Sequence, residues 1–159
     1  MYKATREFIK ARQPFAKYSI YLHTSVQKVG GGERNQCFKN SYNVAQASKE
    51  TSNKVSCMSG WLVQPYDKEK NCTAIIQHWW NVDSTGRHFD TSPFVATGEE
   101  YVMDFDLYEF SREHFERIKS NVTMSLLLKN GKFSILTDAD SMRFTDVSEL
   151  RTELFFNYV

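Results

Sequence analysis

The chain has 159 residues, of which 41% are hydrophobic and 25% are charged, and its formal net charge is +1. This length suits one domain that buries its own core without disulfides or metals. A charge so close to zero gives no electrostatic basis for binding nucleic acid or an anionic membrane. The many aromatic residues (12 Phe, 8 Tyr and 3 Trp) favour a core that contains a β-sheet.

Neither membrane insertion nor an oxidising compartment is indicated. The sequence has no apolar run long enough to cross a bilayer, and no signal-peptide core follows Met1. Its three cysteines, Cys37, Cys57 and Cys72, are unevenly spaced and form no CxxC pair. This spacing argues against a disulfide framework and a cysteine-rich zinc site. We expect a cytoplasmic protein with no membrane or nucleic-acid partner.

The first third of the chain predicts two helices separated by a flexible loop. Residues 1–17 have helical patterning that Pro14 interrupts, and residues 18–23 fit either a short strand or a continuation of that helix. Three consecutive glycines, at positions 30–32, predict a loop whose backbone can turn sharply. In residues 35–47 apolar positions repeat at helical spacing, with Asn35 as an acceptable N-cap. Cys37 is therefore expected in the first helical turn.

The remainder predicts strands and two further helices. Six stretches have the apolar patterning of strands: 55–63, 73–82, 87–91, 101–107, 124–128 and 132–136. Asn130-Gly131 separates the last two and is a strong signal for a hairpin turn. Helices are predicted over 111–119 and 148–155. Without repeats, low-complexity segments or linkers, residues 1–159 are expected to form one α+β domain.

Three residues have the types required for thiol catalysis. A cysteine attacks as its thiolate, which a helix N-terminus and a neighbouring imidazole both stabilise. A carboxylate behind the imidazole fixes its tautomer and orientation. Cys37, His78 and Asp90 therefore predict a nucleophile, a base and an orienting group.

The turn between residues 73–82 and 87–91 tests whether His78 and Asp90 can meet. Because both residue numbers are even, His78 and Asp90 share a face of paired antiparallel strands only if the numbers of paired residues have an even sum. A three-residue loop, 84–86, pairs 83 with 87 and 80 with 90, and so meets this condition. Such loops favour a type I turn followed by a left-handed residue, which is where Gly86 falls. Asp83 suits the first position of that turn.

The pattern His78-x-Trp80, Gly86 and Asp90-x-Ser92-Pro93 resembles the histidine and aspartate motifs of the transglutaminase-like superfamily, a branch of the papain-like cysteine enzymes. Gln36-Cys37 and Ala45 match the family's cysteine motif loosely. The resemblance covers residues 30–93. It implies an α+β, papain-like fold in which N-terminal helices, one beginning at the nucleophile, pack on an antiparallel β-sheet.

Other residues compete for these roles. Cys57 precedes a strand pattern, and Cys72 lies only six residues before His78, an awkward geometry for attack. His88 shares the predicted face of His78 and is the best alternative base. A zinc site formed by His78, His88 and Asp90 is chemically possible, because zinc binds imidazole and carboxylate ligands.

The function expected is cysteine-dependent acyl transfer on a protein or peptide amide, as in a protease, deamidase or transglutaminase-type enzyme, with no cofactor. An oxyanion hole would use the Cys37 backbone N–H and a second donor, with Gln36 and Trp80 as candidates and Gln77 a further possibility. The alternative is an inactive member of the fold that binds a partner protein through an aromatic surface. Substrate, acyl acceptor and oligomeric state are left open.

Overall fold

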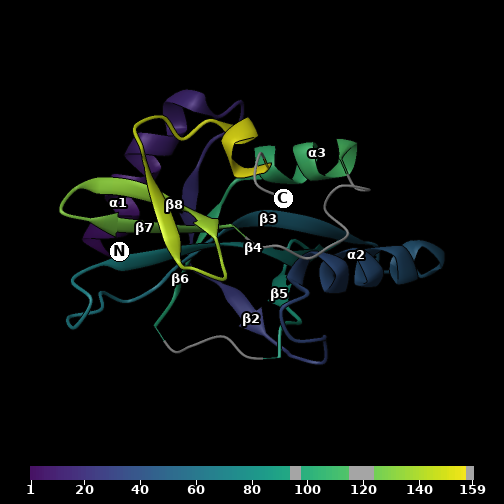
Figure 1. Ribbon diagram of the computed structural model, residues 1–159. Helices are drawn as coiled ribbons and strands as arrows, with labels where there is room; N and C mark the ends of the chain where they lie inside the picture. Colours follow the sequence, from purple (N-terminus) through teal and green to yellow (C-terminus); the bar gives the residue numbers. More distant parts are fainter. Residues whose placement is uncertain (94–97, 115–123, 157–159) are drawn as a thin grey trace.

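The computed structural model describes residues 1–93, 98–114 and 124–156. It is an α+β structure whose helices pack on an open, largely antiparallel sheet (Figure 1). The helices, with the short 3-10 turns marked η, are α1 (Lys3–Arg12), η1 (Gln13–Phe15), α2 (Cys37–Ala47), η2 (Ser48–Glu50), α3 (Phe105–Glu113) and η3 (Thr152–Phe156). The strands are β1 (Tyr21–His23), β2 (Val26–Lys28), β3 (Val55–Val63), β4 (Thr73–Asp83), β5 (His88–Asp90), β6 (Glu100–Met103), β7 (Ser125–Lys129), β8 (Lys132–Asp138) and β9 (Arg143–Val147).

The sheet has the strand order β1-β6-β3-β4-β7-β8-β9, and β5 pairs with both β4 and β2. Its centre is β3 against β4, paired over the whole of β3 from Val55↔Asp83 to Val63↔Ile75. On the other side of β4, β7 pairs with residues 73–76 and β5 with residues 81 and 82. Residues 78–80 thus have no strand partner on that side in the described chain, which leaves an opening in the sheet.

Both faces of the central strands are buried, because alternate side chains enter two separate apolar clusters. The larger cluster joins Trp61 and Trp79 to Phe8 of α1 and Leu107 of α3. Figure 1 shows α1 and α3 on the same side of β3 and β4. The smaller cluster includes Trp80 and lies on the opposite face, where His78 also points. The sheet therefore carries helices on one face and the predicted histidine on the other.

Several sequence predictions are confirmed. The α+β class is right, α1 gives way to a 3-10 turn at Pro14, and the strand predicted over 55–63 has those bounds. Asn130 and Gly131 both have positive φ values, 50° and 73°, at the turn between β7 and β8. Of the two options for residues 18–23, the strand is found, as β1.

The strand predicted over 101–107 is wrong after Met103. Asp104 is the N-cap of α3. This helix begins at Phe105, six residues before the start predicted at position 111. The alternation of apolar and acidic positions had suggested a strand, but Leu107 is fully buried, and both side-chain oxygens of Asp106 accept backbone N–H groups of Lys17 and Tyr18. These tertiary contacts favour the helix. Residues 115–119 of the predicted helix lie outside the described residues.

The helix predicted over 148–155 is also wrong in its first half. Only Thr152–Phe156 are helical, as the 3-10 turn η3. The carbonyl of Leu150 accepts a hydrogen bond from Arg12 Nη1 at 3.1 Å, so this backbone group serves a tertiary contact. Two strands, β2 and β9, were not predicted; both are short and mostly exposed.

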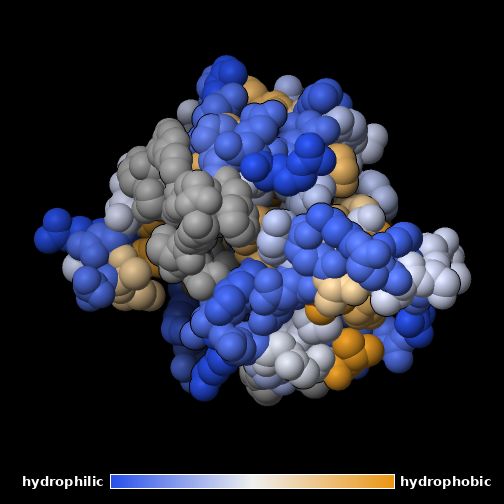
Figure 2. Space-filling view, turned by 90° about the vertical axis from the view of Figure 1, so that its right-hand side faces the viewer, coloured by the Kyte–Doolittle hydropathy of each residue, from blue (hydrophilic) through white to orange (hydrophobic). Residues whose placement is uncertain are grey.

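The large hydrophobic residues that are exposed in the described chain are scattered. Figure 2 shows one side that is largely hydrophilic, with hydrophobic residues in small separate groups. Large hydrophobic side chains that are exposed in the described chain, such as Tyr21, Tyr66 and Met142, are far apart in the sequence and lie on different elements or turns. Among the described residues, no helix combines the length and apolar character needed to cross a bilayer.

Candidate active site

The β4–β5 hairpin has the predicted three-residue loop. The Asp83 backbone N–H donates to the Arg87 carbonyl at 3.0 Å, and the next pairs are Val82↔His88 and Asn81↔Phe89. Gly86 has a φ of +84°, in the left-handed region that the turn requires. The Asp83 carboxylate accepts the Thr85 backbone N–H at 2.9 Å and fixes the turn. This register gives the even sum that brings His78 and Asp90 to the same face.

His78 and Asp90 form a direct, buried hydrogen bond. The distance from His78 Nε2 to Asp90 Oδ2 is 2.7 Å, and both residues are at most 5% exposed. Two further donors hold the carboxylate: the Tyr101 hydroxyl reaches Oδ2 at 2.8 Å, and the Ser92 backbone N–H reaches Oδ1 at 2.9 Å. Burial alone would raise the pKa of Asp90, but the hydrogen bond and charge of His78, with these donors, lower it. The aspartate is therefore held as a carboxylate.

Cys37 is the first residue of α2 and so lies in the first helical turn, as the sequence predicted. The N-cap is Gln36 rather than the expected Asn35. The helix packs beside the opening in β4. Ser41 Oγ donates to the Trp80 carbonyl at 2.8 Å, and Asn81 Nδ2 donates to the Ser41 carbonyl at 2.9 Å. These bonds, one turn after Cys37, set the position of the helix N-terminus against β4.

A backbone loop ties the cysteine helix to the aspartate strand. The carbonyl of Asp90 accepts the Val29 backbone N–H at 2.9 Å, and the Gly32 N–H donates to the Thr91 carbonyl at 2.8 Å. Asn40, one turn into α2, closes the loop with Oδ1 and Nδ2 bonds to the backbone of Glu33 at 3.0 and 2.7 Å. A Cβ on Gly32 would lie 2.6–2.7 Å from Asn40 and Thr91 atoms, so the close approach requires glycine.

These elements bring Cys37 to His78. The imidazole hydrogen-bonds the Cys37 thiol in addition to Asp90. Because Nε2 is bonded to Asp90, Nδ1 is the ring nitrogen that faces the thiol. Burial by itself lowers the pKa of His78, but the hydrogen bonds with Asp90 and Cys37 outweigh it and raise the pKa to about 10. The imidazole is therefore protonated at neutral pH beside the cysteine.

This raised pKa predicts a pH dependence of stability. The folded-state pKa of about 10 exceeds the ordinary histidine value of 6.5, so protonation of His78 favours the folded chain. The stabilisation is fully present below pH 6.5 and is lost as the pH rises through about 10. Between these limits, the free energy of unfolding of the wild type should fall by up to about 1 kcal/mol per pH unit more than that of a His78→Gln variant. Urea unfolding at several pH values measures this difference, and parallel profiles would contradict the assignment.

A cleft of about 210 Å³ opens beside the thiol and the imidazole. Cys37, His78 and Gln77 line it at one end. Its remaining lining comes from the loop before α2, the ends of β3 and β4 and the segments flanking β5 and β6, and consists of Arg34, Asn35, Leu62, Gln64, Ile76, Ser92, Pro93 and Glu99. The reactive pair thus has access to a space of the size of an amino-acid side chain.

The predicted oxyanion donors are placed differently. Trp80 donates its indole N–H to His88 Nδ1 at 3.0 Å, and neither Trp80 nor Gln36 is among the residues lining the cleft. Gln77 does line it, and its Nε2 is buried without a hydrogen-bond partner in the described chain, while its Oε1 accepts the Met124 N–H at 3.2 Å. The Cys37 N–H, in the first turn of α2, has no i−4 carbonyl partner within the helix.

The competing residues lie elsewhere. Cys57, on β3, is 2% exposed, and burial raises the pKa of its thiol. Cys72 is also buried, at the turn before β4. His88 stacks on His23 with ring centroids 3.8 Å apart and accepts the Trp80 N–H. No group of three or more potential metal ligands occurs among the described residues, so the suggested zinc site with His78, His88 and Asp90 gains no geometric support.

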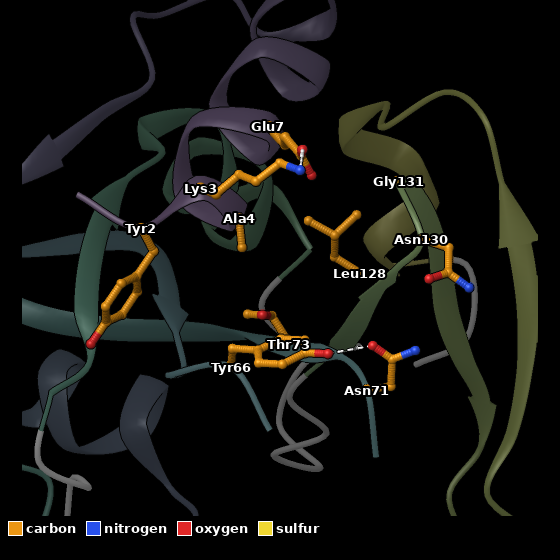
Figure 3. A pocket seen from close by; sticks show the side chains of 10 residues that line it. All are labelled: Tyr2, Lys3, Ala4, Glu7, Tyr66, Asn71, Thr73, Leu128, Asn130 and Gly131. Atoms are coloured by element: carbon orange, nitrogen blue, oxygen red, sulfur yellow. Dashed lines mark hydrogen bonds and ion pairs between the residues drawn. The ribbon is translucent and has the colours of Figure 1, made fainter. Parts of the chain in front are cut away.

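A larger cavity lies away from this site. It measures about 610 Å³ and lies between the start of α1, the turn before β4 and the β7–β8 turn (Figure 3). Figure 3 shows Lys3 paired with Glu7 and Tyr66 bonded to Asn71 around it. It shares no lining residue with the cleft and contains no cysteine or histidine. We therefore place the candidate site at the smaller cleft, where the reactive groups are.

Comparisons of the chain with models of protein families, with curated proteins and with solved structures find no match. The resemblance to the transglutaminase-like superfamily therefore depends on the motif residues and their arrangement alone.

Proposed function

We propose that the protein is a cysteine-dependent acyl-transfer enzyme that acts on a protein or peptide amide, with Cys37 as nucleophile, His78 as proton carrier and Asp90 as the group that orients His78. The observation that carries the proposal is the continuous chain of bonds from the Cys37 thiol through the imidazole to the Asp90 carboxylate. Three separate elements supply these groups, and the cysteine and the histidine line a cleft. Such a combination of nucleophile, base and orienting group is characteristic of thiol catalysis.

Acylation follows from the placement of the protons. The proton shared by Cys37 and His78 lies on the imidazole, and the Cys37 thiolate attacks the amide carbonyl carbon to give a tetrahedral intermediate. When the carbon–nitrogen bond breaks, His78 returns the proton to the leaving amine, and a thioester remains on Cys37. Asp90 accepts the Nε2–H throughout, which keeps Nδ1 directed at the reacting atoms.

The second half of the reaction reverses these roles. An acceptor nucleophile loses its proton to His78 and attacks the thioester, and breaking of the carbon–sulfur bond restores the Cys37 thiolate beside the protonated imidazole. Water as acceptor gives hydrolysis, and an amine gives transfer. Both outcomes use the same three residues, so the proposal covers protease, deamidase and transglutaminase-type reactions.

The negative charge of the tetrahedral oxygen needs donors. The N–H of Cys37, which has no partner within α2, supplies one, and the helix dipole favours negative charge at the same place. We assign the second to the Gln77 carboxamide, because it lines the cleft and has an Nε2 without a partner in the described chain. The papain-like form of the α+β fold, with the nucleophile opening a helix that packs on the sheet, belongs to the same proposal.

Activity-based profiling tests the proposed function. Purified wild-type protein and the Cys37→Ala variant are incubated with a library of peptide amides, and products are detected by mass spectrometry. We expect products with the wild type and none with Cys37→Ala, whereas Cys72→Ala, which removes a buried cysteine that does not line the cleft, retains them. Equal product formation by wild type and Cys37→Ala would contradict a cysteine mechanism. Absence of any product, together with an inert Cys37, would favour the alternative of an inactive protein-binding module.

A further inference from the structure

The cleft beside Cys37 has an apolar floor. Leu62 of β3 and Ile76 of β4 are directly paired across the sheet, and Ile76 lies two residues from His78 on the same face. A substrate side chain that extends from the reacting carbonyl in this direction therefore contacts these aliphatic side chains first. Gln64, two residues beyond Leu62, also lines the cleft, on the side away from His78 along the strand.

The far end carries a buried carboxylate. Glu99 directly precedes β6, whose residue Glu100 pairs with Val63, so Glu99 lies beside Gln64. Its carboxylate accepts the Gln64 Nε2–H and is also 4.0 Å from Lys28 Nζ. The Glu99 side chain is only 4% exposed, whereas that of Lys28 is 42% exposed.

This arrangement favours a positively charged substrate group. A carboxylate removed from water attracts a cation more strongly than an exposed one does, because the surroundings screen less. The Lys28 ammonium lies at the limit of ion-pair distance and on a flexible stem in contact with solvent, so a substrate cation can replace it. Arg34 also lines the cleft, but it is exposed, and its charge is more strongly screened by solvent.

We propose that the substrate residue next to the reacting carbonyl has a long aliphatic side chain with a cationic end, as in lysine or arginine, and that Glu99 recognises its charge. The aliphatic part lies over Leu62 and Ile76, and the cation reaches Glu99. Short acidic or hydroxyl side chains would end over the apolar floor. This inference rests on the proposed function of Cys37 and names the class of substrate.

Matched covalent probes test the proposal without a known substrate. N-acetyl-lysine chloromethyl ketone and N-acetyl-norleucine chloromethyl ketone have side chains of nearly the same shape and differ in the terminal charge. The second-order rate of Cys37 alkylation is measured for each by peptide mapping. We expect the lysine probe to react about tenfold faster, because the buried Glu99 carboxylate attracts its terminal charge. The ratio of the two rates cancels differences in the reactivity of the thiol itself.

Variants test whether Glu99 causes the preference for the lysine probe. In Glu99→Gln it should fall to about one, and in Lys28→Gln, which removes the competing cation at a half-exposed position, it should rise. Glu149→Gln removes an exposed carboxylate outside the cleft and should keep the wild-type ratio. A wild-type ratio near one, or a ratio that Glu99→Gln and Lys28→Gln both leave unchanged, overturns the inference. Iodoacetamide, which has no such side chain, separates the two claims: if it does not select Cys37, the proposed function fails as well.

Discussion

The His78→Gln variant is expected to be alkylated at Cys37 by iodoacetamide about 100-fold more slowly than the wild type at pH 6. An ordinary thiol has a pKa of about 8.5, so under about 1% of it is thiolate at this pH. A protonated imidazole in contact stabilises the thiolate as an ion pair, and glutamine carries no charge to replace it. The rate is measured from the time course of Cys37 labelling by peptide mapping.

His114→Gln is the matched control for this variant. His114 stacks on Phe110 at the end of α3 and does not line the cleft, so its loss should leave the alkylation rate within about twofold of the wild type. The pH profile adds a second criterion. The wild-type rate should change little from pH 6 to 8, whereas the rate of His78→Gln should rise with pH as an ordinary thiol ionises. Identical profiles for the two proteins would mean that His78 does not activate Cys37.

The Arg12→Met variant is expected to lower the free energy of unfolding by about 3–5 kcal/mol. Arg12 and Asp104 are fully buried and form a two-point ion pair with distances of 2.9 and 3.3 Å. Arg12 also donates to the Leu150 carbonyl and to Thr152 Oγ1, while Trp61 Nε1 donates to Asp104 at 2.9 Å. Loss of the guanidinium leaves a buried carboxylate without its cation and frees the C-terminal segment from α1. Urea unfolding followed by circular dichroism measures the change.

Two comparisons separate this effect from the general loss of a charge. Lys3→Met removes the cation of an exposed pair with Glu7 and should change the free energy of unfolding by less than about 1 kcal/mol. The double variant Arg12→Met/Asp104→Leu removes both buried charges and should be more stable than Arg12→Met alone. If Arg12→Met costs less than about 1 kcal/mol, the ion pair does not anchor the N-terminal helix and the C-terminal segment.

The sequence predicted best those elements that local chemistry determines. The β4–β5 register was predicted from one glycine. Gly86 suits the left-handed position of a three-residue loop, and a three-residue loop gives the strand pairing that is found. Asn130-Gly131 specified the β7–β8 turn in the same way. The strand over 55–63 was recognisable from its apolar run.

Elements that depend on distant partners were not predictable from local patterns. Asp104, the N-cap of α3, pairs with Arg12, which lies 92 positions away in the sequence. Asp106 in the same helix accepts hydrogen bonds from the backbone of residues 17 and 18. The chain around Leu150 is not helical, and the Leu150 carbonyl accepts a hydrogen bond from Arg12. Strand β2 is only three residues long and pairs in parallel with β5, so its sequence carries almost no periodic signal.

The candidate site shows the same division. Residue type, order and turn parity predicted that Cys37, His78 and Asp90 lie together, and the structure places them in contact. Tyr101 was missed, because its bond to Asp90 depends on the placement of β6 beside β3 rather than on any motif. Gln77 could be named only as one possibility among several, and the cleft lining now distinguishes it from Gln36 and Trp80.

Competitive alkylation of the three cysteines tests the central claim most directly. The folded protein is treated with a limiting amount of iodoacetamide at pH 6, and modification at Cys37, Cys57 and Cys72 is quantified by peptide mapping. An activated nucleophile predicts that Cys37 is modified at least about 100-fold faster than the other two, because it alone contacts a protonated imidazole at a helix N-terminus. Equal modification of all three, or a Cys37 that reacts only after unfolding, would contradict the account.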